Sequence, residues 1–407
     1  MTSSSQRIAA VDAARGCAMV MVCVSHIKHH FLESWPVLHW LIVSTTRIAT
    51  PVFLLLSGFV IRYLLRTDPR GNASITLVDR GLFLLLIAHS LLGLADLPEL
   101  GFVQWMFGRA VITDAVGFAL LAAVLLRNAS TGTLAVLGAT LCVVGWVLGM
   151  TLTPQTELQR LLGAILFEVR RTGDLPVDLA LVPFVGVFLI GMSISSSLHE
   201  WLVTRQEGLI ARRLFRLGSL ALGAALLGGA VWHFGKGYLV PALGSPELSE
   251  FVRITLDPRS KNPPSPAYFL FYGGAGLVAL AILFNGRPAA LVSPVIRRAS
   301  VLGRASLMCF VLQDWMMFVV PKVFGFSDVQ SLGFWIFWLG VCLVVLYTAS
   351  RQWDAHRGNR LLTIGLKALA RRQLATRAAA ANEGGAFIAG WKDPRYGWIR
   401  GVRKHRF

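Results

Sequence analysis

Long apolar runs separated by short polar turns set the pattern of this chain. The runs are about 17 to 25 residues long, the length that an α-helix needs to cross a bilayer. Lipid offers no hydrogen-bond partners to backbone groups, so each run is predicted to be helical. The predicted spans are residues 8–28, 41–63, 81–97, 110–126, 133–152, 178–198, 217–234, 267–284, 301–320 and 332–350. The pattern therefore predicts an all-α, polytopic integral membrane helix bundle of about ten transmembrane helices.

The composition agrees with a membrane protein. The 407 residues are 55% hydrophobic and only 15% charged, which leaves too little polar surface for a water-soluble fold of this size. The five cysteines fall inside apolar runs, where they behave as small hydrophobes without metal-ligand or disulfide spacing. No metal site is predicted. The first apolar run carries Asp12 and Arg15 and lacks a small-residue cleavage site, so we expect a retained helix and not a signal peptide.

The basic residues are distributed unevenly over the loops. The chain carries 39 Lys and Arg against 21 Asp and Glu. With the N-terminus in the cytosol, the inner segments hold 27 of these basic residues and the outer ones 11, the asymmetry that orients membrane proteins. Both termini are therefore predicted to be cytoplasmic, with the protein in the bacterial inner (plasma) membrane.

The distribution of basic residues and apolar runs also divides the chain into a membrane-embedded domain over residues 1–350 and a basic cytoplasmic tail over residues 351–407. The tail alone has a net charge of +10. A basic segment beside membrane spans is expected to contact anionic membrane lipid and not nucleic acid. The oligomeric state stays open between a monomer and a homodimer.

Two outer segments are too long to be simple turns. Apolar residues recur with helical spacing from Leu158 to Val169, which predicts an amphipathic helix lying on the membrane face. The segment 235–266 ends in a proline-rich stretch, Asp257 to Pro266, for which we predict a stiff extended strap. Such a strap would be placed to cover a cavity.

Candidate chemistry lies in the first span, which holds Asp12, Arg15 and His26. Ionisable groups at membrane depth are costly, so they are functional candidates by default. Arg15 and His26 are 11 residues apart, which puts them on one helix face and roughly 16 Å apart along the axis. Met19 and Val22 lie between them. The alternative is a purely structural role, with Asp12 and Arg15 forming an ion pair at the interface.

Several motifs carry a resemblance to known membrane acyltransferases. Arg15-Gly16 followed by His26, with the stretch Val11-Asp12-Ala13-Ala14-Arg15-Gly16, resembles the opening of the acyltransferase-3 family. Thr50 to Phe59 is similar to that family's second-helix Phe-Phe-x-x-Ser-Gly-Phe pattern. Ser260 to Ser265 and Leu302 to Leu307 resemble a Lys-Tyr-Pro-Pro-Ser stretch and a Leu-Gly-Arg-x-Ser-Leu helix start of the related heparan-α-glucosaminide N-acetyltransferase-like family.

The resemblance implies acyl transfer from cytosolic acyl-CoA, with acetyl-CoA as the expected donor substrate, to a glycan, glycolipid or amino sugar on the outer side. No bound cofactor is implied. The third helix carries only Arg80 where the acyltransferase-3 pattern has Arg-x-x-Arg, so donor binding would need help from Arg62 or Arg66. We therefore predict catalysis by His26, Arg15, Asp12 and Asp314, and acyl-CoA binding by Arg15, Arg62, Arg66 and Arg80, although Asp314, Arg62 and Arg66 stand where the sequence departs from the family pattern.

Alternatives remain for the individual groups and for the whole chain. His26 would act as a general base or as a transient acyl carrier. Asp314, where the family usually has a histidine, is a second catalytic group or the partner of a buried arginine, and for His89 and Asp114 we favour hydrogen bonding between helices. A proton-coupled transporter or a lipid or glycan flippase would use the same charged stripe as a relay, but the paired broken helices typical of transporters are not seen.

Overall fold

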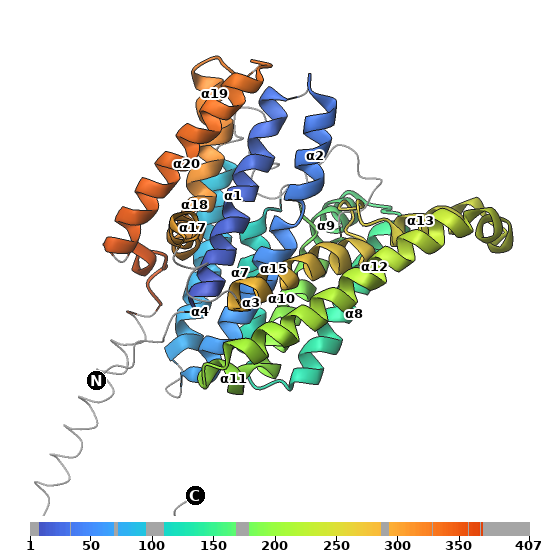
Figure 1. The fold of residues 1–407 in the computed structure, drawn as a ribbon, viewed down its shortest axis with the longest axis horizontal. Helices are drawn as coiled ribbons and strands as arrows, with labels where there is room; N and C mark the ends of the chain where they lie inside the picture. Colours follow the sequence, from blue (N-terminus) through green and yellow to red (C-terminus); the bar gives the residue numbers. More distant parts are fainter. Residues whose placement is uncertain are drawn as a thin grey trace, which may run out of the picture. The chain divides into compact units, whose positions relative to one another are not determined.

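The structure is a computed structural model, and it divides the chain into two compact units, Met1–Thr363 and Ile364–Phe407. The candidate membrane-spanning helices found among the described residues lie in the first unit. The structure describes residues 8–32, 34–68, 72–94, 110–167, 179–285, 293–327, 329–356, 358–366 and 368. Over these ranges the chain forms helices and no strand, which confirms the all-α prediction (Figure 1).

The helical elements follow one another along the whole described chain. Three of them, η1 to η3, are π-helical turns inside longer helices, and η4 is a 3-10 turn. The elements are α1 (Ala9–Phe31), α2 (Pro36–Thr46), α3 (Ala49–Thr67), α4 (Asn72–Phe83), η1 (Leu84–Ala88), α5 (His89–Gly93), α7 (Ile112–Leu125), α8 (Thr131–Thr151), α9 (Glu157–Phe167), α10 (Leu181–Ser197), α11 (His199–Val203), α12 (Glu207–Leu243), α13 (Pro246–Leu256), α14 (Pro266–Tyr268), η2 (Phe269–Gly273), α15 (Gly274–Asn285), α17 (Pro294–Arg304), α18 (Ser306–Asp314), η3 (Trp315–Val319), α19 (Val320–Val323), α20 (Leu332–Ala355) and η4 (Gly358–Arg360).

The predicted spans correspond to helices of the structure. In the described ranges, 8 helices are long and apolar enough to cross a membrane, and the shorter apolar helices α7 and α10 occupy the two remaining predicted positions. The fold is therefore a polytopic membrane helix bundle, as predicted. The second span is divided by a turn at Arg47 and Ile48 into α2 and α3.

The outer segments give one confirmed prediction and one correction. The amphipathic helix is present as α9, and the end of its predicted range, residues 168–169, lies outside the described residues. Most of the segment 235–266 is helical, because α12 continues to Leu243 and α13 follows. The prediction of an extended strap over 257–266 was wrong, because residues 257–265 form a turn and Pro266 begins α14. Pro246 is compatible with helix since it occupies the first turn of α13, where its missing N–H needs no partner. Only residues 257–265 form a turn, which the hydroxyl of Ser265 closes by donating to the carbonyl of Asp257 at 2.9 Å.

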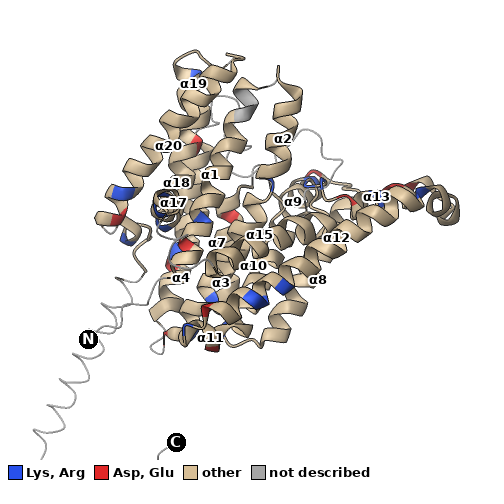
Figure 2. Ribbon diagram, viewed as in Figure 1, with Lys and Arg blue, Asp and Glu red and all other residues tan. Residues whose placement is uncertain are grey.

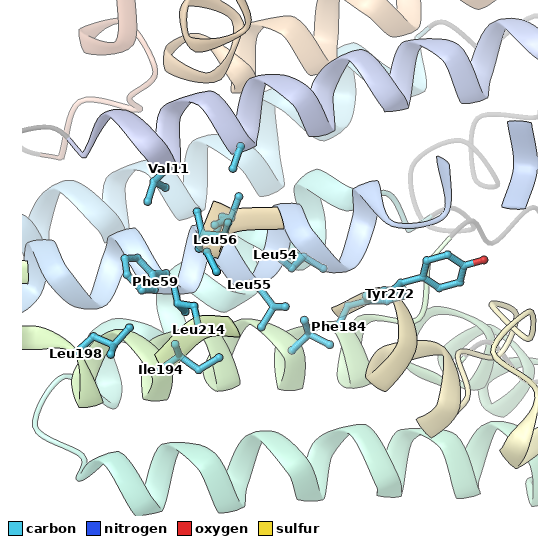
Figure 3. Packing of buried hydrophobic residues seen from close by; sticks show 14 of the residues in the cluster. Val11, Leu54, Leu55, Leu56, Phe59, Phe184, Ile194, Leu198, Leu214 and Tyr272 are labelled. Atoms are coloured by element: carbon cyan, nitrogen blue, oxygen red, sulfur yellow. The ribbon is translucent and has the colours of Figure 1, made fainter. Parts of the chain in front are cut away.

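Small residues allow the central helices to come close together. An added Cβ at Gly58 of α3 would lie 2.0 Å from the carbonyl oxygen of Phe188 in α10. Around this contact, apolar side chains of the two helices fill the core seen in Figure 3, among them Leu55, Phe59 and Ile194. Backbone proximity of this kind is how helices associate in lipid, where no hydrophobic force drives them together.

A second close crossing joins α1 to α17. An added Cβ at Gly16 would lie 1.7 Å from the carbonyl oxygen of Ala299, and one at Gly303 would lie 1.9 Å from that of Asp12. Neither glycine accepts a larger residue without movement of a helix backbone. The crossing therefore fixes the height of α1 relative to α17 and to α18, which follows it.

Charged residues are sparse across the bundle, as Figure 2 shows for the ribbon. Four of the charged residues that the structure describes have less than a tenth of their surface exposed, namely Arg62, Asp79, Asp114 and Asp314. Burial of a charge is costly unless a partner or a ligand compensates for it. These positions therefore indicate where polar interactions inside the bundle are concentrated.

Candidate active site

Three arginines from distant parts of the chain line one cavity of about 140 Å³, which we call the arginine cavity. Arg15 comes from α1, Arg80 from α4 and Arg304 from the end of α17. The hydroxyl-bearing residues Ser57 and Ser306 also line it. A cluster of three guanidinium groups with hydroxyls between them suits an anionic or carbonyl-bearing ligand.

Arg15 is held by two contacts within this cavity. Its Nη2 donates to the hydroxyl of Ser306 at 2.8 Å, and its guanidinium carbon lies 5.2 Å from the centre of the Phe53 ring. Asp12, one turn earlier on α1, interacts with it electrostatically. The buried Nε has no hydrogen-bond partner among the described residues. Arg15 thus retains a donor that the protein does not satisfy, which is typical of a binding group.

The other two arginines are tied to the end of α20 and to the turn that follows it. Arg304 forms an ion pair with Asp354 at 2.8 Å, and its backbone carbonyl accepts a hydrogen bond from the side chain of Asn359 at 3.0 Å. Arg80 donates to the backbone carbonyl of Asn359 at 3.4 Å. Asn359 and Leu362 line the arginine cavity, so the turn after α20 forms part of its wall.

Arg304 is a site residue that the sequence analysis did not single out. Its signal was the Leu302-Gly303-Arg304-Ala305-Ser306 stretch, which was used only for the family resemblance. The structure places both Arg304 and Ser306 of this stretch at the arginine cavity.

Arg62 and Arg66 do not join the arginine cavity. The guanidinium of Arg62 donates to the Ser196 hydroxyl at 2.9 Å and to the carbonyls of Arg127 and Ala129 at 2.5 and 2.7 Å. Two of its nitrogens therefore hold the turn between α7 and α8, and the third ties Arg62 to α10. Arg66 is exposed and lies outside the cavity lining. Of the four arginines considered for acyl-CoA, the structure brings together Arg15 and Arg80.

His26 lines a second, larger cavity of about 380 Å³, which we call the histidine cavity. Asp314 and Gln313, at the end of α18, lie in its wall, and so does Lys261 from the turn 257–265. Part of the proline-rich stretch thus covers a cavity, although it is not extended. The His26 ring lies 5.6 Å from the ring of Phe318, and Gln313 carries a buried Oε1 without a hydrogen-bond partner among the described residues. Polar groups therefore converge on a largely apolar space, as in small-molecule sites.

The two cavities meet at α1 and at Phe53. Arg15 lines one cavity and His26 the other, while Met19 and Val22 are buried between them. Phe53, on the neighbouring helix α3, lines both cavities. The structure thus brings His26 and Asp314 together in one cavity and places Arg15 in the other, while Asp12 interacts electrostatically with Arg15 and lines neither cavity.

His89 and Asp114 have a different place. The Nδ1 atom of His89 lies 2.9 and 3.0 Å from the two carboxylate oxygens of Asp114, linking α5 to α7. The backbone N–H of Val111 also donates to this carboxylate, at 2.9 Å. The contact between His89 and Asp114 confirms the predicted hydrogen bond between helices. Neither residue lines either cavity.

Comparison with known protein families gives the class of the protein. The model of the family described as heparan-alpha-glucosaminide N-acetyltransferase, catalytic, matches residues 7–225, more than half of the chain. The chain belongs to this family. It is therefore a transmembrane acetyltransferase of the heparan-alpha-glucosaminide N-acetyltransferase type, in agreement with the resemblance. No curated protein and no solved structure matches it.

The family match covers only part of the site. It includes Asp12, Arg15, His26, Phe53 and Arg80, on the first three spans. Arg304, Ser306 and Asp314 lie beyond it, and they join the site through the packing of α1 against α17 and α18. No cluster of metal-ligating side chains is found in the described part of the chain.

Proposed function

We propose that this protein transfers an acetyl group from cytosolic acetyl-CoA to a hydroxyl or amino group of a glycan on the other side of the membrane. The observation that carries the proposal is the pair of cavities beside α1, one lined by three arginines and the other by His26, with Phe53 common to both. The basic inner loops support the orientation with the arginine cavity toward the cytosol.

The arginine cavity suits the thioester end of the donor. At about 30 Å³ per water molecule, its volume of about 140 Å³ would hold only about five waters. The nucleotide part of CoA would therefore remain outside, near the basic loops. The arm of the donor next to the thioester would pass through this cavity, and its amide carbonyls would accept hydrogen bonds from Arg15. The acyl end would then extend toward His26, where the reaction takes place.

The histidine cavity suits the acceptor. Its volume of about 380 Å³ lies within the usual range of small-molecule sites, about 300–1,000 Å³. Lys261, Gln313 and Asp314 offer both donors and acceptors of hydrogen bonds, which a sugar requires. Asp314 lies on the same cavity as His26, where it would orient the acceptor or stabilise a protonated imidazole.

Two routes satisfy the chemistry. In the first, His26 takes the proton of the acceptor hydroxyl or amine while the heteroatom attacks the thioester carbon; the C–S bond breaks and the thiolate of CoA is then protonated. In the second, the imidazole nitrogen attacks the carbonyl, CoA leaves, and the acceptor then displaces the imidazole from the acyl group. Both routes yield an acetylated acceptor and free CoA.

A sided assay tests the proposal. The protein is reconstituted into liposomes with a glucosamine-terminated oligosaccharide trapped inside, and acetyl-CoA labelled in the acetyl group is added outside. We expect labelled oligosaccharide inside and an equal amount of free CoA outside, from the molecules whose arginine cavity faces outward. His26→Gln, which keeps a similar side-chain size without a comparable base, should abolish both signals.

Two results would refute the proposal. Intact acetyl-CoA that enters the liposomes without thioester cleavage would make the protein a transporter. Transfer that occurs only when donor and acceptor are on the same side would remove the transmembrane path.

The same assay distinguishes the two chemical routes. Label that stays on the protein when the acceptor is omitted would select the covalent route over the base-only route.

A further inference from the structure

One aromatic side chain stands between the two cavities. Phe53 lines the arginine cavity together with Arg15 and Ser57, and it lines the histidine cavity together with His26 and Phe310. Among the lining residues that the structure describes, Phe53 alone belongs to both cavities. The Phe53 ring therefore marks the position where the described linings of the two cavities adjoin, and a direct passage between them would run past it.

The ring of Phe53 is enclosed on both sides. Only 3% of the residue is exposed. The Phe310 ring meets it edge to face, with centroids 4.8 Å apart and planes at 82°, and the guanidinium carbon of Arg15 lies 5.2 Å from its centroid. Each neighbour belongs to one of the two cavities. The ring is thus positioned by residues from both ends of the path.

The separation of the chemical groups gives this ring a role. Arg15 and His26 are 11 residues apart on α1, or roughly 16 Å along the helix axis. A donor held at Arg15 and a reaction at His26 therefore require the acyl end to extend past the position of Phe53. An acetyl group adds one methyl to the carbonyl carbon, whereas a butyryl group adds two further methylenes that must occupy the same passage.

We infer that Phe53 is the specificity-determining partition of the path and that its ring limits the length of the acyl group that reaches His26. The inference rests on the proposed function. Phe53 makes and breaks no bond; it acts by the space that its ring occupies. In a close-fitting apolar pocket, one methylene changes the ratio of kcat/KM between two substrates by about 10- to 200-fold. The two extra methylenes of a butyryl group should therefore give the wild type at least about a hundredfold preference for acetyl-CoA over butyryl-CoA.

Activity toward the two donors tests the inference. The ratio of kcat/KM for acetyl-CoA to kcat/KM for butyryl-CoA is measured for the wild type, Phe53→Leu and Phe53→Ala. We expect the ratio to fall to less than about ten in Phe53→Ala and to an intermediate value in Phe53→Leu. The leucine variant keeps most of the volume, so it gives a folded protein even where the alanine variant does not.

Phe59→Ala is the matched control. Phe59 lies on the same helix, is 2% exposed and lines neither cavity. Its loss should lower stability but leave the donor ratio unchanged. A wild-type ratio in folded Phe53→Leu and Phe53→Ala, or an equal fall of the ratio in Phe59→Ala, would overturn the inference.

A second measurement does not depend on catalysis. Ser57→Cys places a thiol in the arginine cavity, and a membrane-impermeant thiol reagent is applied to intact cells from the side of the histidine cavity. Labelling above the background of the native cysteines should rise at least about tenfold when Phe53→Ala is added. Unchanged labelling would overturn the partition. Increased labelling in a protein whose wild type cleaves no acetyl-CoA would refute the proposed function and leave only the partition standing.

Discussion

Replacing Arg15 by lysine is the sharpest test of the arginine cavity. Lysine keeps the positive charge near Asp12 but loses the planar fork of the guanidinium. In the structure this fork spans the Ser306 hydroxyl, 2.8 Å away, and the face of the Phe53 ring. A compact ammonium on a shorter stem cannot keep both contacts and also donate to a carbonyl of the bound donor.

The magnitude follows from the lost hydrogen bond. A hydrogen bond to a charged group contributes about 1.5–3 kcal/mol, and each 1.36 kcal/mol corresponds to tenfold in rate. Arg15→Lys should therefore lower kcat/KM for acetyl-CoA by about 10- to 150-fold. The assay is the release of free CoA by purified protein in the presence of an amino-sugar acceptor. The melting temperature of the variant in detergent separates this effect from unfolding.

Two further variants show whether the loss of activity comes from the contacts of Arg15 in the cavity. Arg66→Lys is the matched control because Arg66 is exposed and outside the cavity, and it should change kcat/KM by less than about twofold. Ser306→Ala removes the other partner of the hydrogen bond, so its effect should be non-additive with that of Arg15→Lys. Wild-type activity in Arg15→Lys would refute the reasoning and reduce Arg15 to a counter-charge for Asp12.

His26→Ala should leave an inserted, folded protein in which transfer, measured by CoA release, falls at least about a hundredfold, because an acid–base group is lost. The control His233→Ala, on the exposed face of α12, should match the wild type in the same assay. Arg62→Ala should lower the stability by about 1–3 kcal/mol, because two partly buried carbonyls lose their donor, and a variant that melts like the wild type would contradict the role of Arg62 as a clamp. Reporter fusions near Arg212 and Arg298 should place both loops in the cytosol, and an outward-facing reporter at either one would contradict the orientation.

The sequence was sufficient to predict the helices but not their exact ends. Apolar runs reveal spans because the bilayer imposes one length and one backbone conformation. The continuation of α12 past Gly235 was missed because glycine and proline usually end helices, yet here Pro241 occupies the last turn and Gly244 ends the helix with φ at +67°. Local propensity alone does not show which breaker is effective.

The site was predicted in part for a similar reason. The spacing of Arg15 and His26 within one helix is visible in the sequence, since helical geometry relates them directly. The role of Arg62 depends on Ser196 and on carbonyls that only the packed bundle brings within reach. Likewise, no pattern in the sequence indicates that Phe53 touches two cavities. Contacts between helices far apart in the chain decide such roles.

The crossing of α1 and α17 at Gly16 and Gly303 has a consequence for the modularity of the family. The family match ends at residue 225, so α1 lies inside the matched segment while α17, which accepts it, lies outside. A segment cut at that boundary and grafted onto another membrane protein would carry Gly16 without the backbone of Ala299 against which it fits. The two glycines should therefore be inherited as a pair, and residues 7–225 alone should not reproduce the crossing that positions Arg15.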